Sequence, residues 1–383
     1  MENYLPRAIT ALFHKRLQPG KVVILLGARR VGKTVFLKKL QQEMQETPCL
    51  FLNGEDMATR EILERRTVLN YTRLLGKTRF LIIDEAQKVP EIGNILKLMI
   101  DHIPDLRIVA TGSSGFDLSG KLGEPLTGRS FTLQMFPFAQ MEYSVKENII
   151  ESRARLDERL IFGGYPELYS LSSDEEKTVY LRELVNSYLL KDILEFEDLR
   201  NSDKMLALLR LIAFQTGKEV SLDELGRQLS ISKNTVGKYL DLLAKVFIIF
   251  KLPGFSRNLR SEVTKMNRWY FYDNGIRNTL IANLNPLALR NDAGELWENY
   301  IISERVKYQQ YTGVLANNYF WRTYEQHEID WIEESGGLLH AFEMKWKASK
   351  KARVPKLWQT AYPEATFQTI TPENYMEWIT PED

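Results

Sequence analysis

Cysteine is almost absent from this sequence, because Cys49 is the only one among 383 residues. A lone cysteine excludes an intramolecular disulfide framework and a cysteine-cluster zinc site, and it is compatible with a reducing compartment. Long apolar runs are also missing, since no stretch approaches the ~18 residues that span a bilayer. The segment that starts at Met1 lacks the pattern of a signal peptide. We therefore expect a cytoplasmic protein with no membrane association.

An excess of charge of one sign is missing as well. The 51 Lys and Arg residues balance 50 Asp and Glu residues, which leaves a formal net charge of +1. This balance argues against a wholly basic nucleic-acid coat or an acidic disordered tail, so any nucleic-acid surface must be a local patch. Internal repeats are not found, which argues against a solenoid. At about 150 residues per domain, the length predicts two to three domains.

The first third of the chain alternates short apolar runs with helical stretches. Each run is bounded by Gly, Pro, Asn or Asp, as is typical of strands in a parallel sheet that is covered on both faces. The alternation predicts a doubly wound α/β domain. The runs are Val22–Leu26, Leu50–Leu52, Phe80–Ile83, Arg107–Ala110 and Phe131–Leu133.

The strongest motif follows the first of these runs. It matches the phosphate-loop pattern G-x-x-x-x-G-K-[ST] between a strand and a helix from Lys33 to about Glu46, where a chance Gly-rich turn is the alternative. The glycines let the backbone N–H groups point at phosphate oxygens, aided by the helix N-terminus. We expect Lys33 to reach the β- and γ-phosphates of ATP and the Thr34 hydroxyl to bind Mg²⁺. The motif residues are Gly27, Ala28, Arg29, Arg30, Val31, Gly32, Lys33 and Thr34.

A pair of acids ends the buried run Phe80–Ile83. Asp84 is expected to complete the Mg²⁺ shell, and Glu85 is expected to orient or deprotonate the attacking water. Acids often end strands at the solvent boundary, so the pair gains its meaning from the phosphate loop. A catalytic glutamate beside the metal-holding aspartate resembles the branch of P-loop enzymes that includes the AAA ATPases, and it favours hydrolysis over kinase chemistry.

Three further polar residues are candidates for the same site. Thr111 or Ser113, after the run Arg107–Ala110, would contact the γ-phosphate or the water, or else belong to a turn that caps the next helix. Arg129 would neutralise transition-state charge within its own subunit or across a subunit boundary. An ordinary surface ion pair is the alternative for this arginine.

The middle of the chain carries a helix-turn-helix pattern. Ser221 is a predicted N-cap with Glu224 in a capping box, a short turn follows, and a second helix spans Lys233–Val246. The next apolar run, Phe247–Phe250, would form a wing, and the second helix would face a DNA major groove. A protein-contact module has the same pattern, and Asp241 favours that alternative because it dilutes the cationic face.

Carboxylates and a lysine gather in the last third of the sequence. Asp330 precedes a Glu-Ser-Gly-Gly turn, and Glu343 and Lys345 follow it on one face of a predicted strand. Two carboxylates can hold Mg²⁺, and the metal with Lys345 can activate a water that attacks phosphorus. Glu298, on the preceding predicted helix, is a further candidate ligand. The pattern E-x-K is also common by chance in a chain this charged.

The order of the motifs resembles a prokaryotic, archaeal-ATPase-like family of AAA-type P-loop ATPases. Members carry a winged helix and a C-terminal domain of unknown function with a PD-(D/E)xK restriction-endonuclease-like fold. The resemblance implies that Lys33, Thr34, Asp84 and Glu85 serve the ATPase, and that Glu298, Asp330, Glu343 and Lys345 fill the nuclease pattern. Its motifs are GARRVGKT at 27–34, LIIDEAQ at 81–87, ATGSS at 110–114, GRSFTLQMFPF at 128–138, GGYPE at 163–167, YFYDNGIR at 270–277, and ENY, EIDW and FEMKW within 298–346.

These observations predict an α/β protein of three domains. They are a P-loop ATPase domain at residues 1–140, a helical and winged-helix domain at 141–255, and a restriction-endonuclease-like domain at 256–383. The leading hypothesis is a Mg²⁺-dependent ATPase whose nucleotide state regulates a nuclease-like domain that acts on DNA or RNA. The alternative is an ATP-dependent scaffold switch, in which an inactive nuclease-like domain binds a protein partner. Assembly into a homo-oligomer is compatible with both.

Overall fold

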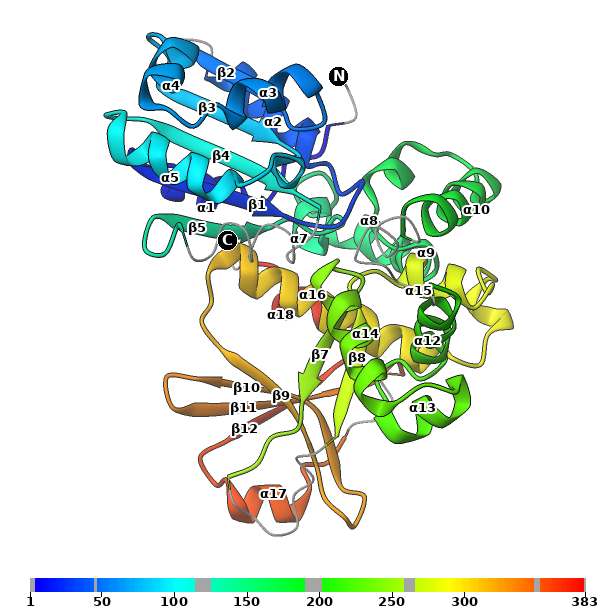
Figure 1. Cartoon of the computed structure of the whole chain (residues 1–383). Helices are drawn as coiled ribbons and strands as arrows, with labels where there is room; N and C mark the ends of the chain where they lie inside the picture. The colour runs from blue at the N-terminus through cyan, green and yellow to red at the C-terminus, as the bar shows by residue number, and fades with distance from the viewer. Residues whose placement is uncertain are drawn as a thin grey trace. The chain divides into compact units, whose positions relative to one another are not determined.

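The computed structural model describes residues 4–44, 47–113, 125–189, 202–257, 266–347 and 352–381. The chain forms two compact units, coloured along the sequence in Figure 1. The N-terminal unit comprises Pro6–Phe136 with Lys245–Phe247, and the C-terminal unit comprises Met1–Leu5, Pro137–Ala244 and Ile248–Asp383. Throughout the described ranges, every helix is too short or too polar to cross a membrane.

The N-terminal unit is built on a parallel sheet of five strands. Their order is β2-β3-β4-β1-β5, so β4 lies between the first strand and the third. All five strands predicted from the apolar runs are present, which confirms the α/β class for this part of the chain. The elements are α1 (Thr10–Arg16), β1 (Lys21–Leu26), α2 (Lys33–Glu43), β2 (Cys49–Asn53), α3 (Met57–Glu64), α4 (Val68–Leu75), β3 (Phe80–Asp84), η1 (Ala86–Lys88), α5 (Ile92–His102), β4 (Arg107–Gly112) and β5 (Ser130–Gln134).

Burial explains why these short runs become strands. The four residues Phe80–Ile83 of β3 are fully buried, and their neighbours in β1 and β4 are nearly so. Strands covered on both faces can be apolar at every position, because neither face meets water. One continuous core joins the strands to α4 and α5, so the sheet provides a rigid base for the loops that follow its strands.

The first part of the C-terminal unit is largely helical. It ends in a three-stranded antiparallel sheet with the order β6-β8-β7. The strand predicted at Trp269–Tyr272 is β8, and it pairs within this sheet rather than with the C-terminal strands. The elements are α7 (Gln140–Tyr143), α8 (Ile149–Ala154), α9 (Leu156–Phe162), η2 (Pro166–Ser170), α10 (Asp174–Glu183), η3 (Leu184–Leu189), α12 (Ser202–Phe214), β6 (Glu219–Val220), α13 (Leu222–Leu229), α14 (Lys233–Lys245), β7 (Ile249–Pro253), β8 (Asn267–Phe271), α15 (Asn274–Leu280) and η4 (Leu287–Leu289).

The predicted pair of helices in this region is present as α13 and α14. The Ser221 hydroxyl accepts a hydrogen bond from the Glu224 N–H at 3.3 Å, so Ser221 is the N-cap of α13. The Glu224 carboxylate instead accepts a hydrogen bond from Gln228, so the predicted capping box is only half formed. Ser230, with a φ of 54°, ends α13 in the left-handed conformation and starts the turn into α14.

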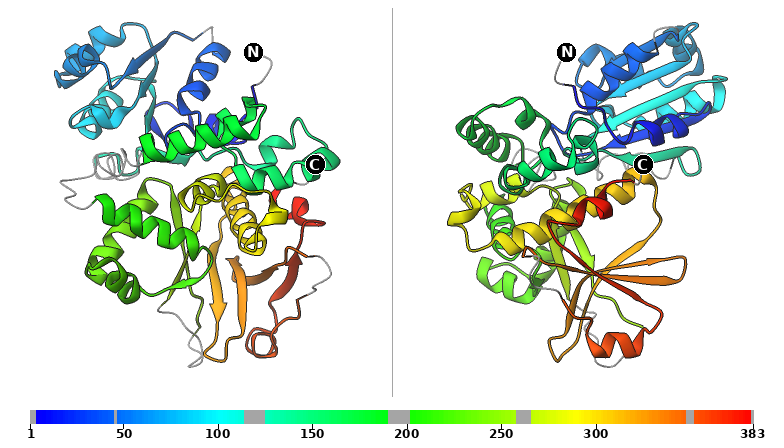
Figure 2. Two further views of the ribbon diagram at one scale, coloured as in Figure 1. Left: turned by 90° about the vertical axis from the view of Figure 1, so that its right-hand side faces the viewer. Right: turned by 180° about the vertical axis from the view of Figure 1, so that it is seen from behind.

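The last part of the C-terminal unit has a mixed four-stranded sheet with the order β12-β11-β10-β9. β10 pairs antiparallel with β9 and β11, whereas β12 runs parallel to β11. Figure 2 shows this sheet from two further sides, with α17 near one end of its strands. The elements are α16 (Ala293–Thr312), β9 (Asn317–Arg322), β10 (Glu328–Ser335), β11 (Leu338–Met344), α17 (Lys356–Ala361), β12 (Thr366–Ile370) and α18 (Tyr375–Ile379).

A β-bulge in β10 determines where Asp330 points. The register with β9 shifts between Ile329 and Ile332. Ile329 and Ile332 both join the core that includes Trp358 of α17, whereas Trp331 joins the opposite core, which includes residues of α16. A bulge adds a residue and re-aims the neighbouring side chains. The irregularity therefore places Asp330 on the face of the sheet that meets α16.

The helical part and the C-terminal sheet share one core. Leu160 of α9, Tyr270 of β8, Trp297 of α16 and Trp331 of β10 belong to the same buried cluster. The boundary predicted near residue 255 therefore crosses continuous packing, and the division into three domains stays a prediction. The structure confirms a parallel five-stranded sheet, a helical middle and a C-terminal mixed sheet, whereas the PD-(D/E)xK fold stays a prediction.

Candidate functional site

The phosphate loop lies between β1 and α2. Gly32 adopts the left-handed conformation, with a φ of 95°, directly before the helix. A side chain on Gly27 would collide with the carbonyl oxygen of Met135, so the close approach of two backbones requires glycine there. The Lys33 ammonium donates hydrogen bonds to the carbonyl oxygens of Gly27 and Ala28, at 2.8 and 2.9 Å. The loop therefore curls around the lysine that the sequence assigns to phosphate binding.

Arg7, from the segment before α1, holds this loop from outside. It is only 5% exposed, and its guanidinium donates to the Val31 carbonyl at 2.7 Å and to the Phe136 carbonyl at 2.6 Å. Hydrogen bonds to charged groups are stronger than bonds between neutral groups. Arg7 thus fastens the middle of the phosphate loop to the chain that follows β5.

The Asp84 carboxylate, only 4% exposed, joins the phosphate loop to β4. The Thr34 hydroxyl donates to one carboxylate oxygen at 2.7 Å, and the Thr111 hydroxyl donates to the other. Because parallel strands end at the same edge of the sheet, residues after β1, β3 and β4 meet at this edge. The structure therefore brings together Thr34, Asp84 and Thr111. The helix that Thr111 or Ser113 would cap lies within residues 114–124, outside the described ranges.

Glu85 is held beside this cluster by its backbone and its side chain. It has a φ of 52°, in the left-handed region where few residues other than glycine are found. Its N–H donates to the Thr111 hydroxyl at 3.1 Å, and its carboxylate accepts a hydrogen bond from Gln87 at 2.6 Å. Gln87 also donates to the Ser113 hydroxyl at 3.2 Å. The half-buried carboxylate is therefore fixed in direction by a buried amide.

Arg129 does not meet the phosphate loop within its own chain. It directly precedes β5, and its carbonyl accepts a hydrogen bond from the N–H of Val22, near the start of β1. The phosphate loop follows the opposite end of β1, so Arg129 lies at the far edge of the sheet. Its guanidinium pairs with Asp101 at 2.8 Å. The role within one subunit is therefore corrected to an ion pair, and a role across a subunit boundary stays a prediction.

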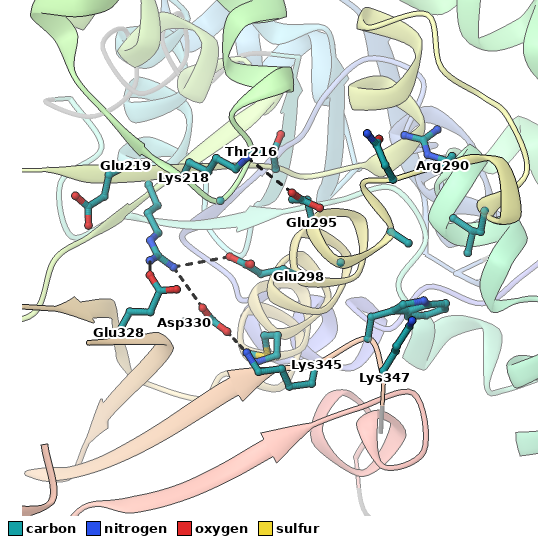
Figure 3. Close-up of a pocket in the computed structure, with 18 of the residues that line it drawn as sticks. Thr216, Lys218, Glu219, Arg290, Glu295, Glu298, Glu328, Asp330, Lys345 and Lys347 are labelled. Atoms are coloured by element: carbon teal, nitrogen blue, oxygen red, sulfur yellow. Dashed lines mark hydrogen bonds and ion pairs between the residues drawn. The ribbon is translucent and has the colours of Figure 1, made fainter. Parts of the chain in front are cut away.

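The C-terminal unit contains a polar cavity of about 910 Å³. Its wall brings together Glu298 of α16, Asp330 of β10 and Lys345, which directly follows β11 (Figure 3). Glu343, the fourth residue of the predicted set, accepts a hydrogen bond from Lys345 at 2.7 Å. The Asp330 carboxylate also accepts the backbone N–H of Met344 at 2.9 Å. The β10–β11 hairpin therefore places Asp330 against the strand that carries Glu343.

A guanidinium lies at the centre of these carboxylates. Arg268, on β8, places Nη1 3.5 Å from Asp330 and 3.9 Å from Glu298, and Nη2 2.8 Å from Glu328. Arg268 is 4% exposed, and its guanidinium stacks 4.6 Å from the centre of the Phe320 ring. The dashed lines in Figure 3 mark the ion pairs made by Glu298, Asp330 and Glu328. The cluster is therefore neutralised in part by the protein itself.

The carboxylates keep raised pKa values despite Arg268 and Lys345. Burial raises the pKa of Glu298 to about 8, and the Asp330 charge adds to this rise while Arg268 opposes it. Burial and Asp330 likewise raise the pKa of Glu343 to about 7, against the hydrogen bond from Lys345. Burial alone would lower the pKa of Lys345, but its bond to Glu343 and the nearby carboxylates raise it. Acids outweigh bases in the cluster.

The two sites differ in how well they fit a divalent cation. Thr34 and Asp84 offer adjacent hydroxyl and carboxylate oxygens, the ligands that Mg²⁺ prefers. In the C-terminal cavity, the oxygens of Glu298 and Asp330 face the guanidinium of Arg268. Across the described residues, no group of three or more His, Cys, Asp or Glu side chains is arranged to hold a metal ion. The C-terminal residues, as arranged, do not fit a metal.

The candidate nucleic-acid surface is the exposed face of α14. Lys233, Asn234 and Lys238 are exposed there. Lys233 lies 3.8 Å from Asp223 of α13, which partly neutralises the face. Lys350 and Lys351, in the basic stretch near the C-terminus, lie outside the described residues. The structure therefore leaves the DNA- or RNA-binding assignment as a prediction.

Comparison with protein families identifies three segments. The model described as "AAA domain" matches residues 19–144. The chain carries an AAA domain. Two models described as domains of unknown function, DUF8612 and DUF4143, follow at residues 153–288 and 293–373. An AAA domain implies nucleotide binding, in agreement with the phosphate loop and its acids.

Relatives of similar organisation occur in bacteria and archaea. An uncharacterized protein of Mycobacterium tuberculosis is 24% identical over 344 residues, which cover 88% of this chain and 73% of the relative. One from Methanocaldococcus jannaschii is 24% identical over 336 residues, covering 83% and 73% of the two chains. One from Haemophilus influenzae is 24% identical over 306 residues, covering 73% of each. The similarity therefore extends well beyond the AAA domain.

Solved structures match the chain only loosely. A DNA replication initiation factor aligns with a TM-score of 0.28 and 15% identity, over 62% of this chain and 90% of that one. DnaA from Aquifex aeolicus with bound AMPPCP aligns with a TM-score of 0.27 and 16% identity, over 63% and 90%. Scores this low do not establish a shared overall fold.

Three residues of these sites escaped the sequence interpretation. Gln87 stands two positions after Glu85, and this short spacing on the loop after β3 is the signal that could have indicated it. Arg268 lies one residue before the predicted strand at Trp269–Tyr272, in a segment interpreted as a basic connector. Arg7 gives no local signal, because the two carbonyl groups it binds lie 24 and 129 positions away.

We expect Arg7→Met to loosen the phosphate loop. The substitution keeps most of the apolar volume but leaves two buried carbonyl groups without their donor, at a cost of roughly 1–3 kcal/mol each. The melting temperature should fall, and ATP should bind several-fold more weakly in calorimetric titration. Arg16→Met is the matched control, because Arg16 stacks on Phe131 in the same unit without contacting the loop. Unchanged ATP affinity in folded Arg7→Met protein would contradict this role.

Proposed function

We propose that the AAA domain of this chain binds ATP with Mg²⁺ and hydrolyses it. The observation that carries the proposal is the buried Asp84 carboxylate, which accepts hydrogen bonds from both Thr34 and Thr111. Thr34 and Asp84 would hold Mg²⁺, which neutralises charge on the β- and γ-phosphates. The remaining steps belong to the side chains around them.

Each neighbouring side chain has a distinct task in the proposed reaction. Lys33 exchanges its bonds to the loop carbonyls for bonds to the phosphates, which places a positive charge where negative charge develops. Glu85 accepts a proton from the attacking water as general base. Thr111 holds the Glu85 backbone, and Gln87 holds the Glu85 side chain. Gln87 is therefore a positioning residue that acts through Glu85.

We expect Lys33→Ala to abolish hydrolysis, because the ammonium that neutralises the phosphates is lost. Glu85→Gln should retain ATP binding and lower kcat by roughly 10²–10⁴, the usual contribution of a general base. Phosphate release and ATP affinity are measured for each variant. Lys38→Ala, an exposed change on the same helix, serves as the control. Unchanged turnover in Lys33→Ala would overturn the proposal.

Gln87→Met should lower kcat roughly tenfold, the equivalent of one lost hydrogen bond, and should leave ATP affinity unchanged. The split between kcat and affinity identifies positioning, because a merely structural defect would weaken both and would lower the melting temperature. Ser113→Ala removes the other partner of Gln87 and should have a smaller effect. Full activity in Gln87→Met would show that Glu85 needs no such support.

The proposal extends to control of the C-terminal unit by the nucleotide. A second candidate function is metal-dependent cleavage of DNA or RNA, favoured by the convergence of Glu298, Asp330 and Lys345 on one cavity. The alternative is a switch in which this unit binds a protein partner without cleaving. The position of Arg268 among the carboxylates favours that alternative for the arrangement described above.

Incubation with plasmid DNA or with RNA and Mg²⁺ or Mn²⁺, with and without ATP, separates the two candidates. The nuclease candidate predicts cleavage that depends on metal and is lost in Asp330→Ala and in Glu343→Ala. Cleavage that survives both substitutions would indicate a contaminant or another site. Absence of cleavage under every condition, together with a nucleotide-dependent change in hydrodynamic size, would favour the switch.

A further inference from the structure

Arg268 differs from an ordinary ion-pair arginine in what surrounds it. Its guanidinium meets carboxylates from two elements, Glu298 on α16 and Asp330 and Glu328 on β10. Arg268 itself belongs to a third element, β8 of the small antiparallel sheet. One positive charge thus enters a cluster of three acids from the neighbouring sheet, within the same unit.

A second ion pair between the same two sheets provides a direct comparison. Arg322 of β9 pairs with Glu219 of β6 at 3.0 Å, one cation with one carboxylate, and the arginine side chain is 26% exposed. This pair is sufficient to connect the sheets. The arrangement around Arg268 is more acidic and more buried than a structural connection requires.

The guanidinium is incompletely satisfied in its place. In the described part of the chain, the buried Nε of Arg268 has no hydrogen-bond partner, and Nη1 meets two acids at 3.5 and 3.9 Å rather than one at close range. For a buried ion pair, the loss of hydration offsets much of the attraction between the charges. Withdrawal of Arg268 would therefore cost less than the number of its partners suggests.

The cluster needs more positive charge than one arginine supplies. Carboxylate oxygens that converge on a polar cavity are the ligands of a hard divalent cation, which carries two charges and takes several oxygens at once. The guanidinium stands where such an ion would be bound, so the two cations exclude each other.

We propose that Arg268 is a built-in latch. Its guanidinium occupies the place of a divalent cation among Glu298, Asp330 and Glu328, and the cavity accepts a divalent cation only when Arg268 withdraws. The proposal concerns the C-terminal unit alone and depends neither on ATP hydrolysis nor on cleavage of nucleic acid.

Binding of Mn²⁺ to the nucleotide-free, metal-stripped full chain tests the latch. Arg268→Ala should gain one Mn²⁺ per chain, with an affinity at least about tenfold above any binding by the wild type at this cavity. Mn²⁺ should also raise the melting temperature of the variant by several degrees more than that of the wild type, since a ligand stabilises the state that binds it. Calorimetric titration and thermal unfolding measure the two effects. Both proteins retain Thr34 and Asp84, so their difference isolates the cavity.

Two further variants decide whether the gained ion lies among these carboxylates. Arg268→Ala combined with Asp330→Asn should lose the extra Mn²⁺. Arg322→Ala, which removes the neighbouring ion pair, should bind Mn²⁺ as the wild type does. Equal Mn²⁺ stoichiometry in the wild type and Arg268→Ala, or an extra ion that survives Asp330→Asn, would overturn the proposal.

A milder substitution keeps the test decisive if Arg268→Ala does not fold. Arg268→Lys retains one positive charge, but its ammonium cannot reach the two sides of the cluster as the forked guanidinium does. Mn²⁺ binding above the wild-type level in Arg268→Lys supports the latch, and binding equal to the wild type contradicts it.

Discussion

The hydrogen bonding of the Asp84 carboxylate is the constraint on which the nucleotide site depends. A buried carboxylate is costly unless its oxygens are satisfied, and Thr34 and Thr111 satisfy one oxygen each. The strand order makes this possible, because β4 lies between β1, which leads into the phosphate loop, and β3, which leads into the acids. The Asp84 carbonyl also accepts the Gly54 N–H at 2.8 Å, which adds the end of β2. One residue thus connects four strand ends.

Sequence pattern predicted most of this unit and little of what surrounds its reacting groups. Strands covered on both faces are continuous apolar runs, and the phosphate loop has a fixed spacing, so both can be recognised in one dimension. Gln87, Arg7 and Arg268 act through contacts that only the folded chain creates. Their residue types are common, and nothing in their neighbourhood separates a buried amide or guanidinium from a solvated one. Arg129 shows the reverse error, because a suggestive position in the sequence lies at the wrong edge of the sheet.

Several motifs of the resemblance have a packing role rather than a chemical one. The carboxylate of Asp273, in the segment YFYDNGIR, accepts the N–H of Gly164, in the segment GGYPE, at 2.7 Å. Asn274 donates to the carbonyl groups of Leu160 and Leu296, which joins α15 to the helices on either side. Buried polar groups of this kind tolerate few substitutions, because each must find its partner. A recurrent motif can therefore mark a fold without marking a reaction.

The C-terminal set Glu298, Asp330, Glu343 and Lys345 illustrates the opposite limit of motif reasoning. Its spacing is that of a metal-dependent nuclease, yet spacing cannot register a cation that arrives from another sheet. A guanidinium and a hydrated divalent ion are both attracted by carboxylates, but they demand different surroundings. The guanidinium takes oxygens in one plane and stacks on a ring, as Arg268 does on Phe320, whereas Mg²⁺ requires oxygens in an octahedron and keeps water. Which cation the cluster holds is therefore decided by the position of β8, and the acids alone do not determine the chemistry of the site.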